Sequence, residues 1–268
     1  MKSIIVTGAT GFVGRHMVPY LLKNGYRIIA VGRNKNKAKQ FSWFDDVEFH
    51  ELDCHESFLE LTSYNNIGLL HLAWDALTDI NDSFHFEVVL PKNYNFIKDL
   101  ICKGVSNVLV TGTWMEYGIT NGELSTNTPT NPITPYAFAK ASLQKQLEFL
   151  RKEHTVNIKW ARLFSIYGEG QDKSGILSLL DDAIDNGDEQ FNMSSGEQIR
   201  DFMSIESVVE ELGNLYTINA SGIYNICSEN PISIRSLVEK RVEYRKSNIK
   251  LNLGYYPISK PMAFWGKK

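Results

Sequence analysis

The stretch Thr7-Gly8-Ala9-Thr10-Gly11-Phe12-Val13-Gly14 decides the fold, because of what lies on either side of it. The apolar run Ser3–Thr7 leads into it and is typical of a buried strand, whereas Phe12–Asn24 has helical spacing and stops at Gly25. Glycines at this spacing let the backbone turn tightly and approach a pyrophosphate, and a helix N-terminus offers N–H groups to its oxygens. The stretch therefore predicts a dinucleotide site at the first strand–helix turn.

Strand and helix patterns alternate over the first 165 residues. Further strands are expected at Arg27–Val31, Val47–His50, Gly68–Ala73, Val105–Thr111 and Val156–Leu163, with helices at Phe84–Lys103 and Pro135–Glu153. Strands joined through helices form right-handed crossovers, which give a parallel sheet covered on both faces. The expected fold class is α/β, a Rossmann-type doubly wound parallel sheet with a small C-terminal substrate-binding lobe.

The pattern becomes shorter and richer in loops after Ser165. Helices are expected at Ile176–Asn186, Ser207–Tyr216 and Ser233–Tyr244, a strand at Ile223–Ile226, and a turn-rich connection without regular structure at Ile119–Thr134. We expect residues 1–165 to form the cofactor-binding domain, which includes the helix Pro135–Glu153. Residues 166–268 then form a smaller lobe, interleaved with the first part.

Composition narrows the class of protein. The 268 residues carry a net charge of −3. The chain thus lacks the excess of basic residues that would indicate nucleic-acid binding. No stretch approaches the roughly 20 apolar residues of a membrane helix. The cysteines Cys54, Cys102 and Cys227 lie far apart, which favours reduced thiols over a disulfide or a metal site. We expect a cytoplasmic protein without a metal and without a nucleic-acid or membrane partner.

The end of the second strand bears on the choice of cofactor. NAD-preferring proteins place an acidic residue there to hold the ribose hydroxyls, but this chain has Gly32-Arg33-Asn34. Gly32 leaves space, and the Arg33 guanidinium suits a 2′-phosphate. NADP(H) is therefore favoured. NAD(H) is the alternative, in which Arg33 is a solvated loop cation.

A second constellation lies on the helix Pro135–Glu153. Tyr136 and Lys140 are four residues apart, so their side chains share one helix face. A neighbouring ammonium favours the phenolate, so Lys140 is expected to lower the pKa of Tyr136. Thr113 follows the strand that ends at Thr111, at the sheet edge where parallel sheets bind ligands. A tyrosine and a lysine at this spacing are common on ordinary helices. The glycine stretch earlier in the chain is the reason to interpret the pair as catalytic.

Together these motifs resemble the extended short-chain dehydrogenase/reductase family, whose members act on nucleotide sugars. Thr7–Gly14 is similar to its TGxxGxxG loop, and Thr113, Tyr136 and Lys140 to its catalytic set. In the second part, Arg162–Gly168 resembles the RxFNxYG segment, with Ser165 in place of Asn. Gly196–Phe202 resembles GxQxRDF, whose arginine, here Arg200, grips the nucleotide diphosphate, and Tyr224–Ile226 resembles the YNIG strand.

The resemblance implies two sets of binding residues. The implied cofactor site consists of Gly8, Thr10, Gly11, Phe12, Val13, Gly14, Arg33, Asp53, Cys54, Leu72, Ala73, Thr111, Tyr136 and Lys140. The implied substrate site consists of Thr113, Trp114, Ser165, Gln198 and Arg200. It also implies a homodimer, in which the two long helices of each copy form a four-helix bundle.

The residues directly after Thr113 narrow the chemistry. Dehydratases of the family continue with Asp-Glu, but this chain has Trp114 and Met115, and neither side chain moves a proton. The expected activity is NADPH-dependent reduction of the C4 keto group of a nucleotide-linked 4-keto-6-deoxyhexose, with dTDP as the expected nucleotide. The chain resembles the dTDP-4-dehydro-6-deoxyglucose reductases and CDP-abequose synthases of surface-polysaccharide pathways. A nucleotide-sugar 4-epimerase is the alternative, and a non-catalytic NADP-binding protein is less favoured because Tyr136 and Lys140 are both present.

Overall fold

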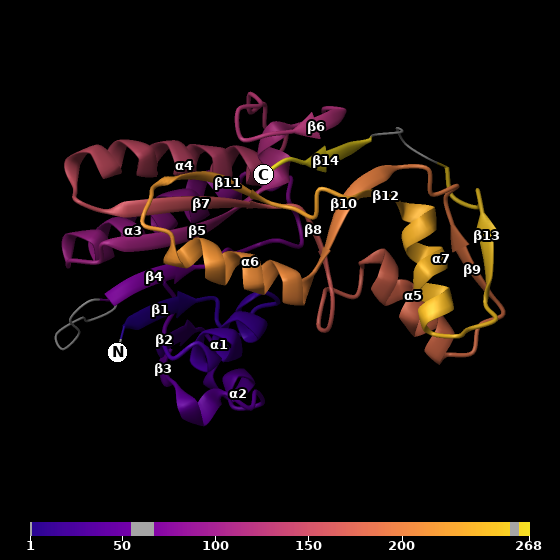
Figure 1. Ribbon diagram of the computed structural model, residues 1–268, viewed down its shortest axis with the longest axis horizontal. Helices are drawn as coiled ribbons and strands as arrows, with labels where there is room; N and C mark the ends of the chain where they lie inside the picture. The colour runs from indigo at the N-terminus through magenta and orange to yellow at the C-terminus, as the bar shows by residue number, and fades with distance from the viewer. Residues whose placement is uncertain (1, 55–66, 258–262) are drawn as a thin grey trace.

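A seven-stranded parallel sheet forms the centre of the molecule (Figure 1). The computed structural model describes residues 2–54, 67–257 and 263–268. The strand order is β11-β7-β5-β4-β1-β2-β3, so the direction of winding reverses between β1 and β4. The strands are β1 (Ser3–Thr7), β2 (Arg27–Gly32), β3 (Glu48–Glu51), β4 (Ile67–His71), β5 (Asn107–Thr113), β7 (Asn157–Leu163) and β11 (Gly222–Ile226). The predicted doubly wound α/β fold is confirmed, and its switch point beside β1 is where such sheets bind ligands.

Helices cover both faces of this sheet. α3 (Leu90–Cys102) and α4 (Pro135–Glu153) lie on one face, and α1 (Gly14–Lys23) and α6 (Ile205–Thr217) on the other (Figure 1). Each face has its own apolar core. Phe96, Leu143 and Trp160 belong to the first, and Met17 and Leu212 to the second. Burial of these side chains on both faces explains why the strands read as continuous apolar runs.

A smaller lobe projects beyond the sheet at the right of Figure 1. It contains α5 (Ile176–Asp185), β9 (Gln190–Met193), α7 (Ile234–Tyr244) and β13 (Lys250–Leu253), packed around Leu180, Met193 and Val238. A three-stranded sheet of β8 (Ser165–Tyr167), β10 (Ile199–Ser204) and β12 (Pro231–Ser233) lies between the lobe and the main body. β11 and α6 also follow residue 165, but they pack into the main body.

Most expected helices and strands lie within a few residues of their predicted bounds, and α4 matches its prediction residue for residue. The expected helix Phe84–Lys103 begins instead with a π-helical turn, η2 (His85–Val89). The prediction that Ile119–Thr134 lacks regular structure is wrong, because β6 (Gly122–Leu124) lies there and pairs with β14 (Phe264–Gly266) near the C-terminus. Two short helical segments lie between β2 and β3, α2 (Lys35–Ala38) and η1 (Phe44–Asp46). Of the helices in the described ranges, none has the length and apolar character needed to cross a bilayer.

Candidate active site

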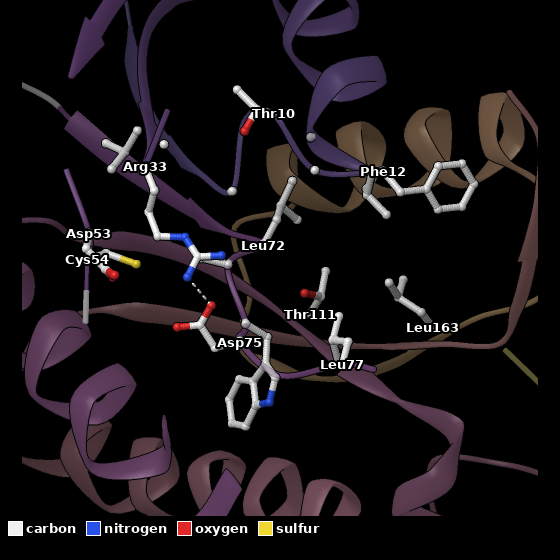
Figure 2. Close-up of a pocket in the computed structure, with 18 of the residues that line it drawn as sticks. Thr10, Phe12, Arg33, Asp53, Cys54, Leu72, Asp75, Leu77, Thr111 and Leu163 are labelled. Carbon is white, nitrogen blue, oxygen red and sulfur yellow. Dashed lines mark ion pairs between the residues drawn. The ribbon is translucent and has the colours of Figure 1, made fainter. Parts of the chain in front are cut away.

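The carboxyl ends of the central strands open into a cavity of about 350 Å³ (Figure 2). The glycine turn after β1, the end of β2, the turn after β4 and one end of α4 form its walls. All residues assigned to the cofactor by sequence line this one cavity, namely Gly8, Thr10, Gly11, Phe12, Val13, Gly14, Arg33, Asp53, Cys54, Leu72, Ala73, Thr111, Tyr136 and Lys140. The fold therefore brings together residues that are up to 132 positions apart, from Gly8 to Lys140.

The glycine turn is shaped to receive a phosphate. Gly8 has a φ of 66°, and a Cβ atom there would lie 2.9 Å from the backbone N of Ala73. A Cβ at Gly14 would lie 2.1 Å from the carbonyl oxygen of Gly8, whereas one at Gly11 would meet only that oxygen, at 3.1 Å. Gly8 thus lets the glycine turn approach the backbone at Ala73, and Gly14 lets the start of α1 approach Gly8. Gly11 leaves room on the side of the cavity. Val13, the N-cap residue of α1, makes no side-chain hydrogen bond to the helix, and a helix N-terminus attracts an anion, so the turn fits the pyrophosphate of a dinucleotide.

Charged side chains gather where β2 ends. The Arg33 guanidinium forms an ion pair with the Asp75 carboxylate, at 2.5 Å (Figure 2), and Lys37 and Asp53 line the same cavity. Burial raises the pKa of the Cys54 thiol to about 12, so this sulfur stays protonated and unreactive at neutral pH.

Tyr136 and Thr113 are joined by a hydrogen bond between their side chains. Burial raises the pKa of the Tyr136 phenol above its usual value, and the negative charge of Glu116 raises it further. The expectation that Lys140 lowers this pKa is not met. The phenol therefore holds its proton, as a proton donor must.

Lys140 reaches other partners. Its ammonium group donates a hydrogen bond of 2.8 Å to the Thr111 carbonyl oxygen and lies 4.0 Å from the centre of the Trp74 ring. Burial lowers the pKa of Lys140 to about 7, and Glu116 acts in the opposite direction. Since both partners lie beside the cavity, the lysine is held at its wall close to Tyr136.

Trp74 and His85 contact Tyr136 of α4 from the side. The Trp74 indole N–H donates to His85 Nδ1 at 3.1 Å, so His85 carries its proton on Nε2 and donates it to the Asp79 carbonyl oxygen at 3.0 Å. The centre of the Tyr136 ring lies 5.9 Å from that of Trp74 and 5.3 Å from that of His85. The two residues were missed by the sequence reasoning. Trp74 directly follows the expected strand Gly68–Ala73, which was the one available signal.

Glu116 holds Thr113 in place from behind. Its buried carboxylate accepts hydrogen bonds from the Thr113 backbone N–H at 2.9 Å, from Trp160 Nε1 at 2.9 Å and from Arg162 Nε at 2.8 Å. A Cβ atom at Gly112 would lie 2.2 Å from Trp160 Nε1, so only glycine leaves room for this cluster. Sequence reasoning missed Glu116 as well. Its spacing from Thr113 matches a capping box, which was the available local signal, whereas Trp160 and Arg162 come from a strand 44 to 46 residues away.

Only some of the expected substrate residues are brought together. Trp114 packs on Phe264 with ring centres 4.3 Å apart and ring planes tilted by 32°, and the Arg200 guanidinium lies 4.4 Å from the centre of the Phe264 ring. Trp114 and Arg200 are thus brought together, next to Thr113. Ser165 instead lines a separate cavity of about 290 Å³. Gln198 lies just before β10, and its Oε1 atom is buried without a hydrogen-bond partner among the described residues.

Comparison with known proteins shows the family of this chain. The model of the "NAD dependent epimerase/dehydratase family" matches residues 4–227. The chain belongs to the NAD-dependent epimerase/dehydratase family. This confirms the resemblance that the motifs indicated. A relative in Aggregatibacter actinomycetemcomitans, dTDP-6-deoxy-L-talose 4-dehydrogenase (NAD(+)), is 32% identical over 99% of this chain and 100% of its own length. CDP-abequose synthase of Salmonella typhimurium is 25% identical over 77% of this chain and 67% of its own.

Solved structures of other epimerase/dehydratase folds agree with the architecture. MoeE5 in complex with UDP-glucuronic acid and NAD superposes with a TM-score of 0.80, at 23% identity, covering 99% of this chain and 89% of that one. UDP-N-acetylglucosamine 4-epimerase from Methanobrevibacter ruminantium gives a TM-score of 0.85 at 18% identity, with the same coverage. The family match ends at residue 227, so Phe264, which packs on Trp114 and Arg200, comes from a part of the chain beyond it.

Proposed function

We propose that this family member reduces the C4 keto group of a nucleotide-linked 4-keto-6-deoxyhexose, with dTDP as the nucleotide. The observation that carries the proposal is the Thr113–Tyr136 hydrogen bond, made by a protonated phenol at the wall of a cavity shaped for a dinucleotide. A carbonyl placed against these two hydroxyls is poised to receive a proton on its oxygen.

Tyr136, Thr113 and Lys140 have different roles in the proposed reduction. A reduced nicotinamide, when bound, supplies the hydride that forms the new C4–H bond. Tyr136 gives its proton to the carbonyl oxygen as negative charge develops there, and Thr113 hydrogen-bonds the same oxygen. Lys140 keeps its ammonium at the cavity wall through the Thr111 carbonyl oxygen, and we assign it a role in binding the reduced cofactor.

The same geometry argues against water loss from the sugar. Elimination needs a carboxyl group beside Thr113, where Trp114 and Met115 stand. Glu116 is the nearest carboxylate along the chain, but it is buried against Arg162 and Trp160 and holds the Thr113 backbone. The name of the Aggregatibacter relative, a dTDP-6-deoxy-L-talose 4-dehydrogenase, also favours oxidoreduction of a deoxysugar.

We propose NADP(H) as the preferred cofactor. Arg33 and Lys37 line the cavity beside Gly32, which leaves space for a 2′-phosphate. NAD(H) is the alternative, and the name of the Aggregatibacter relative and the NAD bound to MoeE5 favour it.

A 4-epimerase is the second candidate, because several solved neighbours are epimerases by name. An epimerase returns the hydride to the sugar and regenerates its cofactor in each turnover. The test is incubation with NADPH or NADH and a panel of nucleotide 4-keto-6-deoxysugars, following the absorbance of the reduced nicotinamide. Loss of one cofactor for each sugar reduced supports the proposal. Interconversion of sugars without loss of absorbance would replace it with the epimerase.

A further inference from the structure

The Arg33–Asp75 ion pair joins two residues that both line the nucleotide cavity. Arg33 follows β2 and Asp75 follows β4, and these strands flank β1 on opposite sides. The pair therefore passes over the end of β1, beside the glycine turn, and Figure 2 shows the two side chains meeting there. The Asp75 side chain is 18% exposed and that of Arg33 62%, so the carboxylate is the more enclosed partner.

The turn that carries Asp75 is held on both sides. Trp74, the preceding residue, is anchored by its hydrogen bond to His85. Ala76, the following residue, has a φ of 57°, in the left-handed region that residues other than glycine seldom adopt, and its carbonyl oxygen accepts a hydrogen bond from the Asp79 N–H at 3.1 Å. Asp75 thus projects toward Arg33 from a fixed backbone.

The charges at this end of the cavity balance. Arg33 and Lys37 contribute two positive charges, and Asp53 and Asp75 contribute two negative ones. A 2′-phosphate bound by Arg33 would have to share the guanidinium with the Asp75 carboxylate, and like charges at such distances repel. The neutral 2′-hydroxyl of NAD(H) meets no such competition.

We propose that Asp75 is a specificity-determining residue. It holds Arg33 in an ion pair and thereby weakens the preference of this pocket for NADP(H) over NAD(H). The inference rests on the proposed function only in taking the cavity as the dinucleotide site. It assigns the choice of cofactor to a residue after β4, in addition to the end of β2. It also explains how an arginine suited to a 2′-phosphate occurs in a chain with a relative named for NAD(+).

The experiment measures binding of NADPH and NADH separately, from the fluorescence of the reduced nicotinamide, without any sugar. The variants are Asp75→Asn, Arg33→Ala and the double variant. Asp45→Asn is the matched control, since it removes the same charge from an exposed position that does not line the cavity. Asp75→Asn is expected to lower the Kd for NADPH about tenfold, the effect of removing one like charge near the phosphate, and to leave the Kd for NADH within about twofold.

The other variants locate the effect on the ion pair. Arg33→Ala should weaken NADPH much more than NADH, and the double variant should lose the gain seen with Asp75→Asn alone. An unchanged ratio of the two Kd values in Asp75→Asn, or an equal change in both, would overturn the proposal. Asp75→Ser serves as a second variant if the first does not fold, as judged by circular dichroism. Failure of the wild-type protein to bind either cofactor would instead contradict the proposed function.

Discussion

Tyr136 is the residue on which the proposed chemistry depends most directly. Its hydroxyl hydrogen-bonds with Thr113 at the cavity wall, and burial keeps it protonated. Tyr136→Phe removes that proton and little else, so cofactor binding should persist while kcat falls by about a thousandfold. Fluorescence titration with NADPH and a turnover assay measure the two effects. Tyr94→Phe, on α3 outside the cavity, is the control and should keep full activity. An active Tyr136→Phe enzyme would remove this residue from the mechanism.

Lys140 should make catalysis sensitive to pH near neutrality. Because burial lowers the pKa of Lys140 to about 7, the ammonium is charged below that pH and neutral above it. If the charged form is the active one, kcat/KM should fall as pH rises through about 7, since this ratio reports the free enzyme. Tyr136 does not contribute to this fall, because its pKa is raised above the usual value for a phenol.

Lys140→Arg separates this titration from other causes of pH dependence. A guanidinium stays charged throughout the measured range, so the fall near pH 7 should disappear even where the rate itself is reduced. A profile with the same midpoint in wild type and variant would assign the titration to another group.

Site residues could be predicted from the sequence where they lie close together in a local motif. Tyr136 and Lys140 are four positions apart on one helix, so local periodicity alone placed them on the same face. Asp75 and Glu116 matter through Arg33 and Arg162, which lie 42 and 46 positions away. No local pattern records such a pairing, because it is created only when the strands assemble.

At the scale of elements, β7 contains a buried charge that lies outside the site. Lys159 is fully buried, and its ammonium donates to Asn107 Oδ1 at 2.5 Å and to the Tyr216 carbonyl oxygen at 3.3 Å. Burial lowers its pKa from 10.5 to about 8. Between these values the unfolded chain binds more protons than the folded one, so the free energy of unfolding rises with pH in that window.

Lys159→Met should remove this part of the pH dependence. The stability of the wild type relative to the variant should increase by about 2 kcal/mol between pH 8 and 10.5, which urea denaturation at the two pH values measures. Lys140 contributes a similar slope to both proteins and cancels in the difference. Lys152→Met, at an exposed position of α4, should show no such change. A stability difference independent of pH would contradict the assignment to Lys159.

The elements also differ in how far sequence could predict them. α4 was predicted with its exact bounds, because Thr134 caps it, Pro135 begins it and the apolar spacing is helical throughout. β6 and β14 have three residues each and pair across more than 140 positions. Segments of this length have no period to detect, and their strand conformation comes from the pairing itself.

For the whole molecule, we propose a homodimer formed through α3 and α4. Phe138 and Phe149 lie on one face of α4, 11 residues apart, and their side chains are 48% and 54% exposed. Phe149→Glu should therefore shift the protein toward the monomer in light scattering. Leu179→Glu, which alters an exposed apolar residue of α5, is the matched control and should leave the dimer intact. A wild-type monomer would exclude this assembly.

The central claim for the whole molecule is that hydride passes once from the cofactor to C4 of the sugar. The most direct measurement uses reduced cofactor carrying deuterium at the transferred position, with a nucleotide 4-keto-6-deoxysugar and the wild-type protein. We predict one deuterium at C4 of the product for each cofactor oxidised, detected by NMR and mass spectrometry, and none with Tyr136→Phe. Sugar product without deuterium at C4, or formed without net oxidation of the cofactor, would contradict the account.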